Sequence, residues 1–265
     1  MTDQDYDYVQ ETARAKNINL LLCPTCRRPY RELAPGVKDW SYGTYRLDGQ
    51  EHPCNCKIQA RIRCHYLLAG IPKNFWHLGP EDFWGDRQAL STVLAYLDNW
   101  KTEKQMGLGA CLFSPVLGVG KTMLATIIAK QLIRQGERVC FTSFRDAVSL
   151  YDLPASAKED KIKRLRETTV LVLDEISVSH ISVAQKNFYA TEFEDLIRFR
   201  TSGDCVTIIA TNLTPEQLED EYPRCFSLLA AKQHYIEVKG EDARADGTKK
   251  LRDLTMAAGK EVRPL

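Results

Sequence analysis

The feature that most constrains this chain is a glycine-rich run, Gly118-Val119-Gly120-Lys121-Thr122, placed between two segments of different character. Residues 110–114 before it form a short apolar run of strand length, and residues 121–134 after it carry apolar side chains at helical spacing. A glycine-rich turn with a lysine between a strand and a helix is typical of a phosphate-binding loop. The glycines let the backbone curl so that successive N–H groups face one phosphate, and the helix dipole adds to the attraction.

Two side chains of this loop have predicted chemical tasks. Lys121 would neutralise β- and γ-phosphate charge, and the Thr122 hydroxyl would ligate Mg²⁺. The loop departs from the usual Gly-x-x-x-x-Gly-Lys-Thr pattern because Pro115 occupies the first glycine position. Proline fixes φ and has no N–H, so we expect a more rigid loop, with binding preserved because later residues supply the N–H groups. The alternative interpretation is an ordinary turn with an exposed lysine.

An acidic pair ends a second strand-like run. Residues 170–173 are apolar and lead directly into Asp174 and Glu175. We expect Asp174 to ligate the Mg²⁺ that Thr122 holds, and Glu175 to polarise the attacking water as a general base. The alternative is a strand with an acidic end that faces solvent.

An amide follows a third apolar run, residues 206–211, at Asn212. Strands of a parallel sheet present their carboxyl ends at one edge, where ligands bind. Asn212 would therefore orient water near the γ-phosphate. The alternative is a turn residue before the helix that the capping box Thr214-Pro215-Glu216-Gln217 predicts.

The rest of the chain from about residue 85 alternates between helical and strand-like segments. Residues 89–100 and 183–200 have helical spacing, and residues 138–142 read as a strand. This alternation predicts an α/β fold, a three-layer parallel sheet with helices on both faces, over residues 71–265. Residues 1–70 differ in composition, and we expect them to form a separate small module.

The composition excludes some classes of protein. Hydrophobic residues make up 44% and charged residues 27%, as in ordinary globular proteins. No apolar run approaches the ~18 residues of a membrane span, and the acidic N-terminus does not look like a secretory signal. We therefore expect no membrane association, and the odd number of cysteines favours a reducing, cytoplasmic compartment. With 36 basic and 35 acidic side chains, net charge gives no indication about nucleic acid.

Five of the nine cysteines lie in the first 64 residues. Two close pairs, Cys23 with Cys26 and Cys54 with Cys56, suit tetrahedral Zn²⁺, and a small loop-rich module needs such a staple. The second pair is Cys-x-Cys, so the pattern is not a strict zinc ribbon. Alternative ligands nearby are Cys64, His52 and His65; free thiols and an iron–sulfur site are the other interpretations.

The motif order resembles that of AAA+ ATPases, and more narrowly the DnaC/IstB-like group of bacterial and phage replicative-helicase loaders and transposition helper ATPases. The resemblance covers about residues 57–240. Two further segments carry it: Ala69-Gly70-Ile71-Pro72-Lys73-Asn74-Phe75 and Tyr222-Pro223-Arg224-Cys225-Phe226-Ser227-Leu228.

The resemblance implies roles for individual residues. Lys121 and Thr122 bind nucleotide, Asp174 and Glu175 hold Mg²⁺ and activate water, and Asn212 is the first sensor. Arg224 would be an arginine finger for a neighbouring subunit, which makes hydrolysis depend on self-assembly; the alternative is a solvated arginine at a helix end. Residues 240–244, ending at Arg244, are the candidate for the second sensor.

At the level of function, the resemblance implies a loader that uses ATP, Mg²⁺ and Zn²⁺. It would bind a hexameric replicative DNA helicase and deliver it onto single-stranded DNA, with ATP hydrolysis driving release. The N-terminal zinc module would contact helicase or DNA. The alternatives are an IstB-like transposition helper acting on target DNA with a transposase, and a non-catalytic adaptor clamped by nucleotide.

A basic cluster marks a candidate DNA surface between residues 158 and 166, in the part that resembles the single-strand channel of helicase loaders. Its members are Lys158, Lys161, Lys163, Arg164 and Arg166. Phe144 and Tyr151 precede the cluster and could stack on bases. Interleaved acidic residues make a solvated helix the alternative.

Overall fold

The computed structural model describes residues 44–47, 50–53, 56–176, 183–203 and 205–242. The chain divides into two compact units, one comprising Met1–His77 with Asp246–Leu265 and the other Leu78–Ala245. The second unit contains the strands β3 (Gly109–Phe113), β4 (Val139–Ser143), β5 (Val170–Ile176), β6 (Val206–Thr211) and β7 (Gln233–Glu237). Its α-helices are α3 (Arg87–Asp98), α4 (Trp100–Met106), α5 (Lys121–Arg134), α6 (Phe144–Ser149), α7 (Ala155–Glu167), α8 (Val183–Thr201), α9 (Pro215–Glu221) and α10 (Pro223–Ala230).

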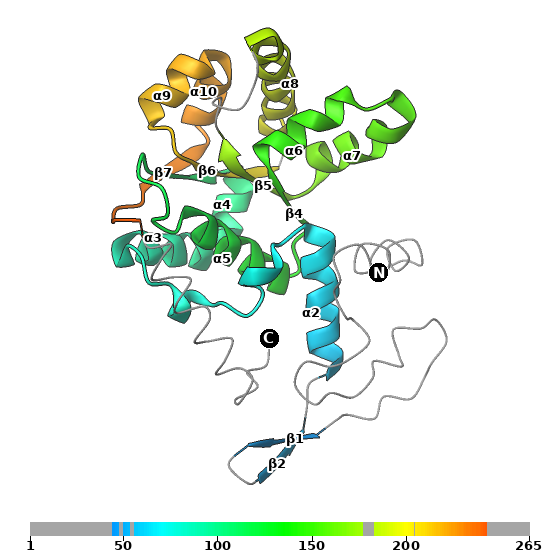
Figure 1. Cartoon of the computed structure of the whole chain (residues 1–265), viewed down its shortest axis with the longest axis vertical. Helices are drawn as coiled ribbons and strands as arrows, with labels where there is room; N and C mark the ends of the chain where they lie inside the picture. Colours follow the sequence, from blue (N-terminus) through cyan, green and yellow to red (C-terminus); the bar gives the residue numbers. More distant parts are fainter. Residues whose placement is uncertain (1–43, 48–49, 54–55, 177–182, 204, 243–265) are drawn as a thin grey trace. The chain divides into compact units, whose positions relative to one another are not determined.

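The five strands form one parallel sheet in the order β4-β5-β6-β3-β7. Helices α3 and α5 lie against one face, and α6, α8, α9 and α10 cover the other (Figure 1). The predicted parallel α/β sheet with helices on both faces is confirmed. The order places β6 between β3, which leads into the glycine-rich loop, and β5, which carries the acidic pair.

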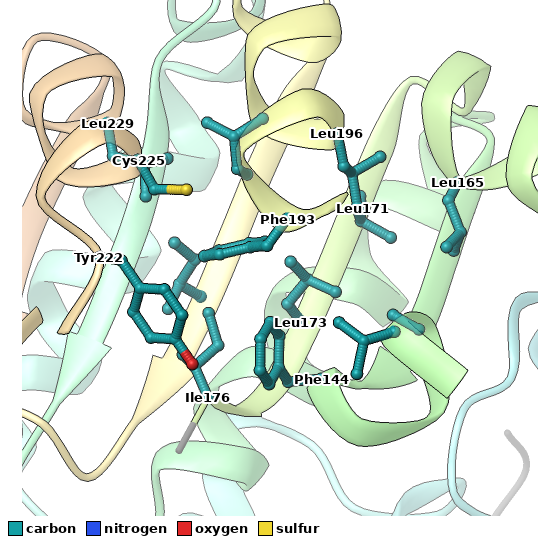
Figure 2. Close-up of a cluster of buried hydrophobic side chains, with 14 of the residues drawn as sticks. Phe144, Leu165, Leu171, Leu173, Ile176, Phe193, Leu196, Tyr222, Cys225 and Leu229 are labelled. Carbon is teal, nitrogen blue, oxygen red and sulfur yellow. The ribbon is translucent and has the colours of Figure 1, made fainter. Parts of the chain in front are cut away.

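The two central strands show why the sheet forms. Every residue of β6 is buried, and in β5 only Glu175 is exposed, as expected of strands covered on both faces. The core on the α8 side gathers three rings, Phe144, Phe193 and Tyr222, with centroids 5.0–5.9 Å apart in edge-to-face contacts (Figure 2). These rings come from α6, α8 and the junction of α9 with α10, so they join three helices over the sheet.

A buried cation fastens α8 to the base of the sheet. Arg200 is fully buried, and its guanidinium donates five hydrogen bonds of 2.5–3.1 Å. The acceptors are the Thr207 hydroxyl and the carbonyls of Leu165, Arg166, Thr168 and Val206. Burial lowers the pKa of Arg200 to about 10, which still leaves it charged at neutral pH. The buried charge is tolerated because its N–H donors are hydrogen-bonded. These hydrogen bonds link the ends of α7 and α8 to the start of β6.

The first unit is described by itself. It contains a two-stranded antiparallel hairpin, β1 (Thr44–Leu47) with β2 (Gln50–Pro53), and the helix α2 (Cys56–Ala69). The helix ends at Gly70, whose φ of 83° is the left-handed conformation that glycine favours, and the Ile71 N–H donates back to the Tyr66 carbonyl. The Arg63 guanidinium lies 5.6 Å from the Trp76 ring centroid.

Candidate functional site

The glycine-rich loop joins β3 to α5 as the sequence predicts. Gly118 and Gly120 have φ of 74° and 100°, values that a residue with a β-carbon adopts only under strain. The Leu124 N–H donates to the Gly120 carbonyl (3.0 Å), so the hydrogen-bond ladder of α5 begins at the loop. The N–H groups before Leu124 therefore stand at the positive end of the helix, where anions bind.

The lysine ammonium organises the start of this loop. Lys121 Nζ donates to the carbonyls of Ser114 (3.1 Å) and Val116 (2.8 Å), which flank Pro115. The loop thus closes around the cation although proline replaces the usual glycine. Val116 and Leu117, between Pro115 and the glycines, expose their side chains.

The first turn of α5 and the end of β5 meet at the loop. The Thr122 hydroxyl donates to Asp174 Oδ1 (3.2 Å), and the Glu175 N–H donates to the same oxygen (3.1 Å). Burial and the Glu175 charge raise the pKa of Asp174 to about 6, while the Thr122 hydrogen bond and the Lys121 charge oppose that rise. Thr122 and Asp174 thus present two oxygen ligands of the kind that Mg²⁺ prefers, and a bound cation would favour the ionised carboxylate.

Glu175 stands on an irregularity of its strand. Its φ is 58°, the left-handed region that residues other than glycine seldom occupy, and the pairing of β5 with β6 shifts register between Leu173 and Ile176. The shift leaves Glu175 exposed between buried neighbours, Asp174 and Ile176. Backbone strain of this kind occurs at active sites, and here it brings two consecutive acidic residues to the same sheet edge with different exposure.

Asn212 directly follows β6, between the strands that carry the loop and the acidic pair. The buried Thr211 hydroxyl donates to the Ile176 carbonyl (2.7 Å) and accepts from the Leu213 N–H (3.0 Å). The Ser114 N–H donates to the Thr211 carbonyl (3.3 Å). Thr211 therefore ties the turn that holds Asn212 to both neighbouring strands, a positioning role that sequence analysis missed.

A second feature missed in the sequence is the segment that packs against the loop. The buried Phe83 ring lies so close to Gly120 that a β-carbon there would come within 2.7 Å of the ring. The Asp86 carboxylate caps α3 through the N–H groups of Gln88 and Ala89, and its other oxygen accepts from the Lys239 N–H (3.0 Å). No motif marks these residues; the packing shows that Phe83 lies against the loop and that Asp86 joins the start of α3 to the segment after β7.

Arg224 lies away from the loop, in the first turn of α10. Its side chain is 82% exposed, and Nη1 lies 3.6 Å from Glu194 Oε2 on α8. The described part of one chain therefore does not bring Arg224 together with Lys121 and Asp174, and its action on a neighbouring subunit stays a prediction. Arg244, the candidate for the second sensor, lies outside the described residues.

The structure corrects one part of the predicted DNA surface. Phe144 and Tyr151 are both buried, Phe144 in the aromatic core and Tyr151 against α7, so stacking of bases on these rings was a wrong prediction. The exposed aromatic side chains of α8 are Phe188 and Phe199, and the Arg166 guanidinium lies 5.6 Å from the Phe199 ring centroid.

The four predicted zinc ligands lie between residues 23 and 56. Cys23, Cys26 and Cys54 lie outside the described residues, and Cys56 is described only as the first residue of α2. Within the described residues, no cluster of three or more His, Cys, Asp or Glu side chains could hold a metal ion. Zinc binding therefore stays a prediction. None of the helices in the described ranges is both long and apolar enough to span a membrane.

Comparison with known families covers most of the second unit. A family model described as IstB-like ATP binding protein matches residues 96–246, which is more than half of the chain. The chain belongs to this IstB-like family of ATP-binding proteins. The match begins in α3 and covers the loop, the acidic pair, Asn212 and Arg224, so every predicted nucleotide-site residue lies in the part that defines the family. Comparison with curated proteins finds no match.

Solved structures confirm the AAA+ P-loop fold of this IstB-like chain. The crystal structure of the DnaC helicase loader matches with a TM-score of 0.54 and 22% identity, over 63% of this chain and all of that one. DnaI matches with a TM-score of 0.54 and 16% identity, over 66% of this chain and 94% of that one. The replication initiator DnaA bound to AMPPCP and single-stranded DNA matches with a TM-score of 0.51 and 20% identity, over 67% of this chain and 55% of that one.

Proposed function

We propose that this IstB-like protein hydrolyses ATP at the edge of its sheet where β3, β5 and β6 end. The observation that carries the proposal is the contact between Thr122 and Asp174, because it brings the phosphate loop and the acidic pair into one site. Neither a turn with an exposed lysine nor an acidic strand end requires the two to meet.

The residues of this site have different proposed roles. The loop N–H groups of Gly118–Gly120 and the Lys121 ammonium bind the phosphates, and Thr122 and Asp174 would hold Mg²⁺. Bound there, Mg²⁺ supplies positive charge to the phosphate oxygens. Glu175, exposed beside the buried Asp174, accepts a proton from the attacking water. Asn212 orients that water.

A steady-state assay of phosphate release tests this proposal. Glu175→Gln keeps the size of the side chain but removes the base, so we expect binding of ATP to persist while turnover falls by about 10²-fold or more. Equal and slow phosphate release by the wild type and Glu175→Gln would instead favour the non-catalytic adaptor.

We further propose that the ATPase loads a hexameric replicative helicase onto single-stranded DNA. The support is the likeness in fold to the DnaC helicase loader over the whole of that chain, together with the family match. ATP binding would organise several copies of this chain, and hydrolysis, completed by Arg224 of a neighbouring copy, would release the helicase. Lys121→Ala should abolish delivery of the helicase to DNA; delivery that is unaffected would contradict the proposal.

Single-stranded DNA would contact α7. Lys161, Lys163 and Arg164 are exposed there, although Glu159 and Asp160 interrupt the positive charge. Backbone phosphates bound by these side chains would release counterions, so binding should weaken steeply with salt. Replacing all three with Gln should reduce the slope of log affinity against log salt.

Residues 1–70 would form the module that contacts the helicase. A Zn²⁺ ion would stabilise this module, with Cys23, Cys26, Cys54 and Cys56 as its ligands. Two close pairs of cysteines support this part of the proposal. Metal analysis of the purified chain tests it, with about one zinc per chain expected and none after replacement of the four cysteines by Ser.

The second candidate is a transposition helper that acts on target DNA with a transposase. The match to an IstB-like family model supports it as well as the loader, because both candidates share the same ATPase core. The partner distinguishes them: the helper would assemble on duplex DNA without a helicase.

A further inference from the structure

The side chain of Arg224 is exposed, whereas buried residues fix its backbone on both sides. Tyr222 and Cys225 are buried, and both turn into the core that Phe193 and Phe144 share (Figure 2). Tyr222 ends α9 and begins α10, so the first turn of α10 cannot shift without disturbing the aromatic cluster. The remaining freedom of Arg224 lies in its own rotamers.

A carboxylate lies within ion-pair distance of the Arg224 guanidinium. Glu194 lies on α8 with 14% of its side chain exposed, and its two oxygens have different partners. Oε1 accepts a short hydrogen bond from Arg198 Nη2 (2.6 Å), one helical turn away, whereas Oε2 lies 3.6 Å from Arg224 Nη1. Burial and the Glu194 charge raise the pKa of the Cys225 thiol to about 12, and the Arg198 charge opposes that rise.

We infer that Glu194 is a positioning residue for Arg224, holding its guanidinium outward for a phosphate bound to a neighbouring copy of this chain. This inference rests on the proposed action of Arg224 between subunits. Arg198 contacts the other oxygen of Glu194, so Arg224 meets the carboxylate only through one long ion pair. Because 82% of the Arg224 side chain remains exposed, most of the guanidinium is open to a second anion.

The experiment measures phosphate release against chain concentration, with single-stranded DNA present, for the wild type, Glu194→Gln, Arg224→Ala and the double variant. Glu194→Gln keeps the side-chain size but removes the ion pair, so we expect the plateau rate to fall about three- to tenfold. In the Arg224→Ala background the same change should have no further effect. Glu194→Asp, which keeps the charge, should recover part of the rate.

Arg198→Gln is the matched control, since it also breaks an ion pair of Glu194 but leaves Arg224 paired. We expect its rate to stay within about twofold of the wild type, and the melting temperature of Glu194→Gln to stay within about 2 °C. The positioning role would be overturned if Glu194→Gln leaves the rate of phosphate release unchanged. It would also be overturned if the double variant loses rate by the full product of the two single losses. If Arg224→Ala itself leaves the rate unchanged, the action of Arg224 between subunits fails, and the role of Glu194 falls with it.

Discussion

Thr122 and Asp174 are 52 residues apart in the chain, and the threonine hydroxyl lies 3.2 Å from the aspartate Oδ1. Thr122 lies in the first turn of α5, which follows β3, whereas Asp174 lies in β5, and β6 separates these two strands. The contact spans β6 and sets two oxygen ligands side by side at the carboxyl edge of the sheet. The ATPase proposal depends on this pair more than on any single motif.

Replacing Thr122 tests the pair directly. Thr122→Val keeps the shape of the side chain but removes the hydroxyl, so we expect the Mg²⁺ concentration for half-maximal phosphate release to rise about tenfold or more. Thr122→Ser keeps the hydroxyl and should stay near the wild type. A normal Mg²⁺ dependence in Thr122→Val would mean that this hydroxyl is not a ligand.

Loss of the loop lysine should weaken nucleotide binding. A charge-assisted hydrogen bond to phosphate contributes about 1.5–3 kcal/mol, so Lys121→Ala should weaken ATP binding about ten- to a hundredfold. Binding of a fluorescent ATP analogue, followed by anisotropy, measures this loss. Lys101→Ala, at an exposed position of α4, is the control and should bind normally.

The raised pKa of Asp174 predicts how stability depends on pH. Between about pH 4 and pH 6 the folded chain keeps a proton on Asp174 that the unfolded chain has lost, so this group makes stability fall as pH rises. Asp174→Asn removes that cost and keeps an Oδ1 acceptor for Thr122. Without nucleotide or Mg²⁺, we expect the variant to be more stable by about 1–3 kcal/mol above pH 6, with no difference near pH 4.

Urea unfolding at several pH values measures this difference, with Asp160→Asn on the exposed face of α7 as the control. If the variant is less stable than the wild type at pH 7.5, the buried Asp174 carboxylate does not destabilise the fold. We expect the same variant to lose phosphate release, because the buried carboxylate that lowers the stability of the fold is also the predicted Mg²⁺ ligand.

Arg200 should be critical for stability rather than chemistry. Arg200→Met fills similar space but leaves buried carbonyl groups without donors, so we expect a loss of about 3 kcal/mol or more in the free energy of unfolding. Arg198→Met, on the exposed side of the same helix, should change it by less than about 1 kcal/mol. Chemical denaturation measures both; equal effects would contradict the assigned role of Arg200.

The sequence predicted the central elements because their patterns are local. The helix over residues 121–134 and the strand over residues 206–211 have the predicted bounds, since an apolar face and a continuous apolar run specify each. The helix predicted over residues 89–100 instead divides at Asn99 into α3 and α4. Strand β7 was not predicted, because at this edge of the sheet only Ile236 of its five residues is buried.

The site was predictable in its residues but not in its geometry. The strained backbone of Glu175 depends on the register shift between β5 and β6, and the role of Thr211 depends on a partner strand distant in sequence. Phe144 looked available for stacking because basic residues follow it. Its burial depends on Phe193 and Tyr222, which only the tertiary structure brings together.

Native mass spectrometry of this chain mixed with the replicative helicase of its own genome or host tests the loader proposal most directly. We predict a defined complex with several copies of each chain that forms with ATP and Mg²⁺ and is lost with Lys121→Ala. No complex with the helicase, together with ATP-dependent assembly of this chain on duplex DNA alone, would contradict the loader and favour the transposition helper.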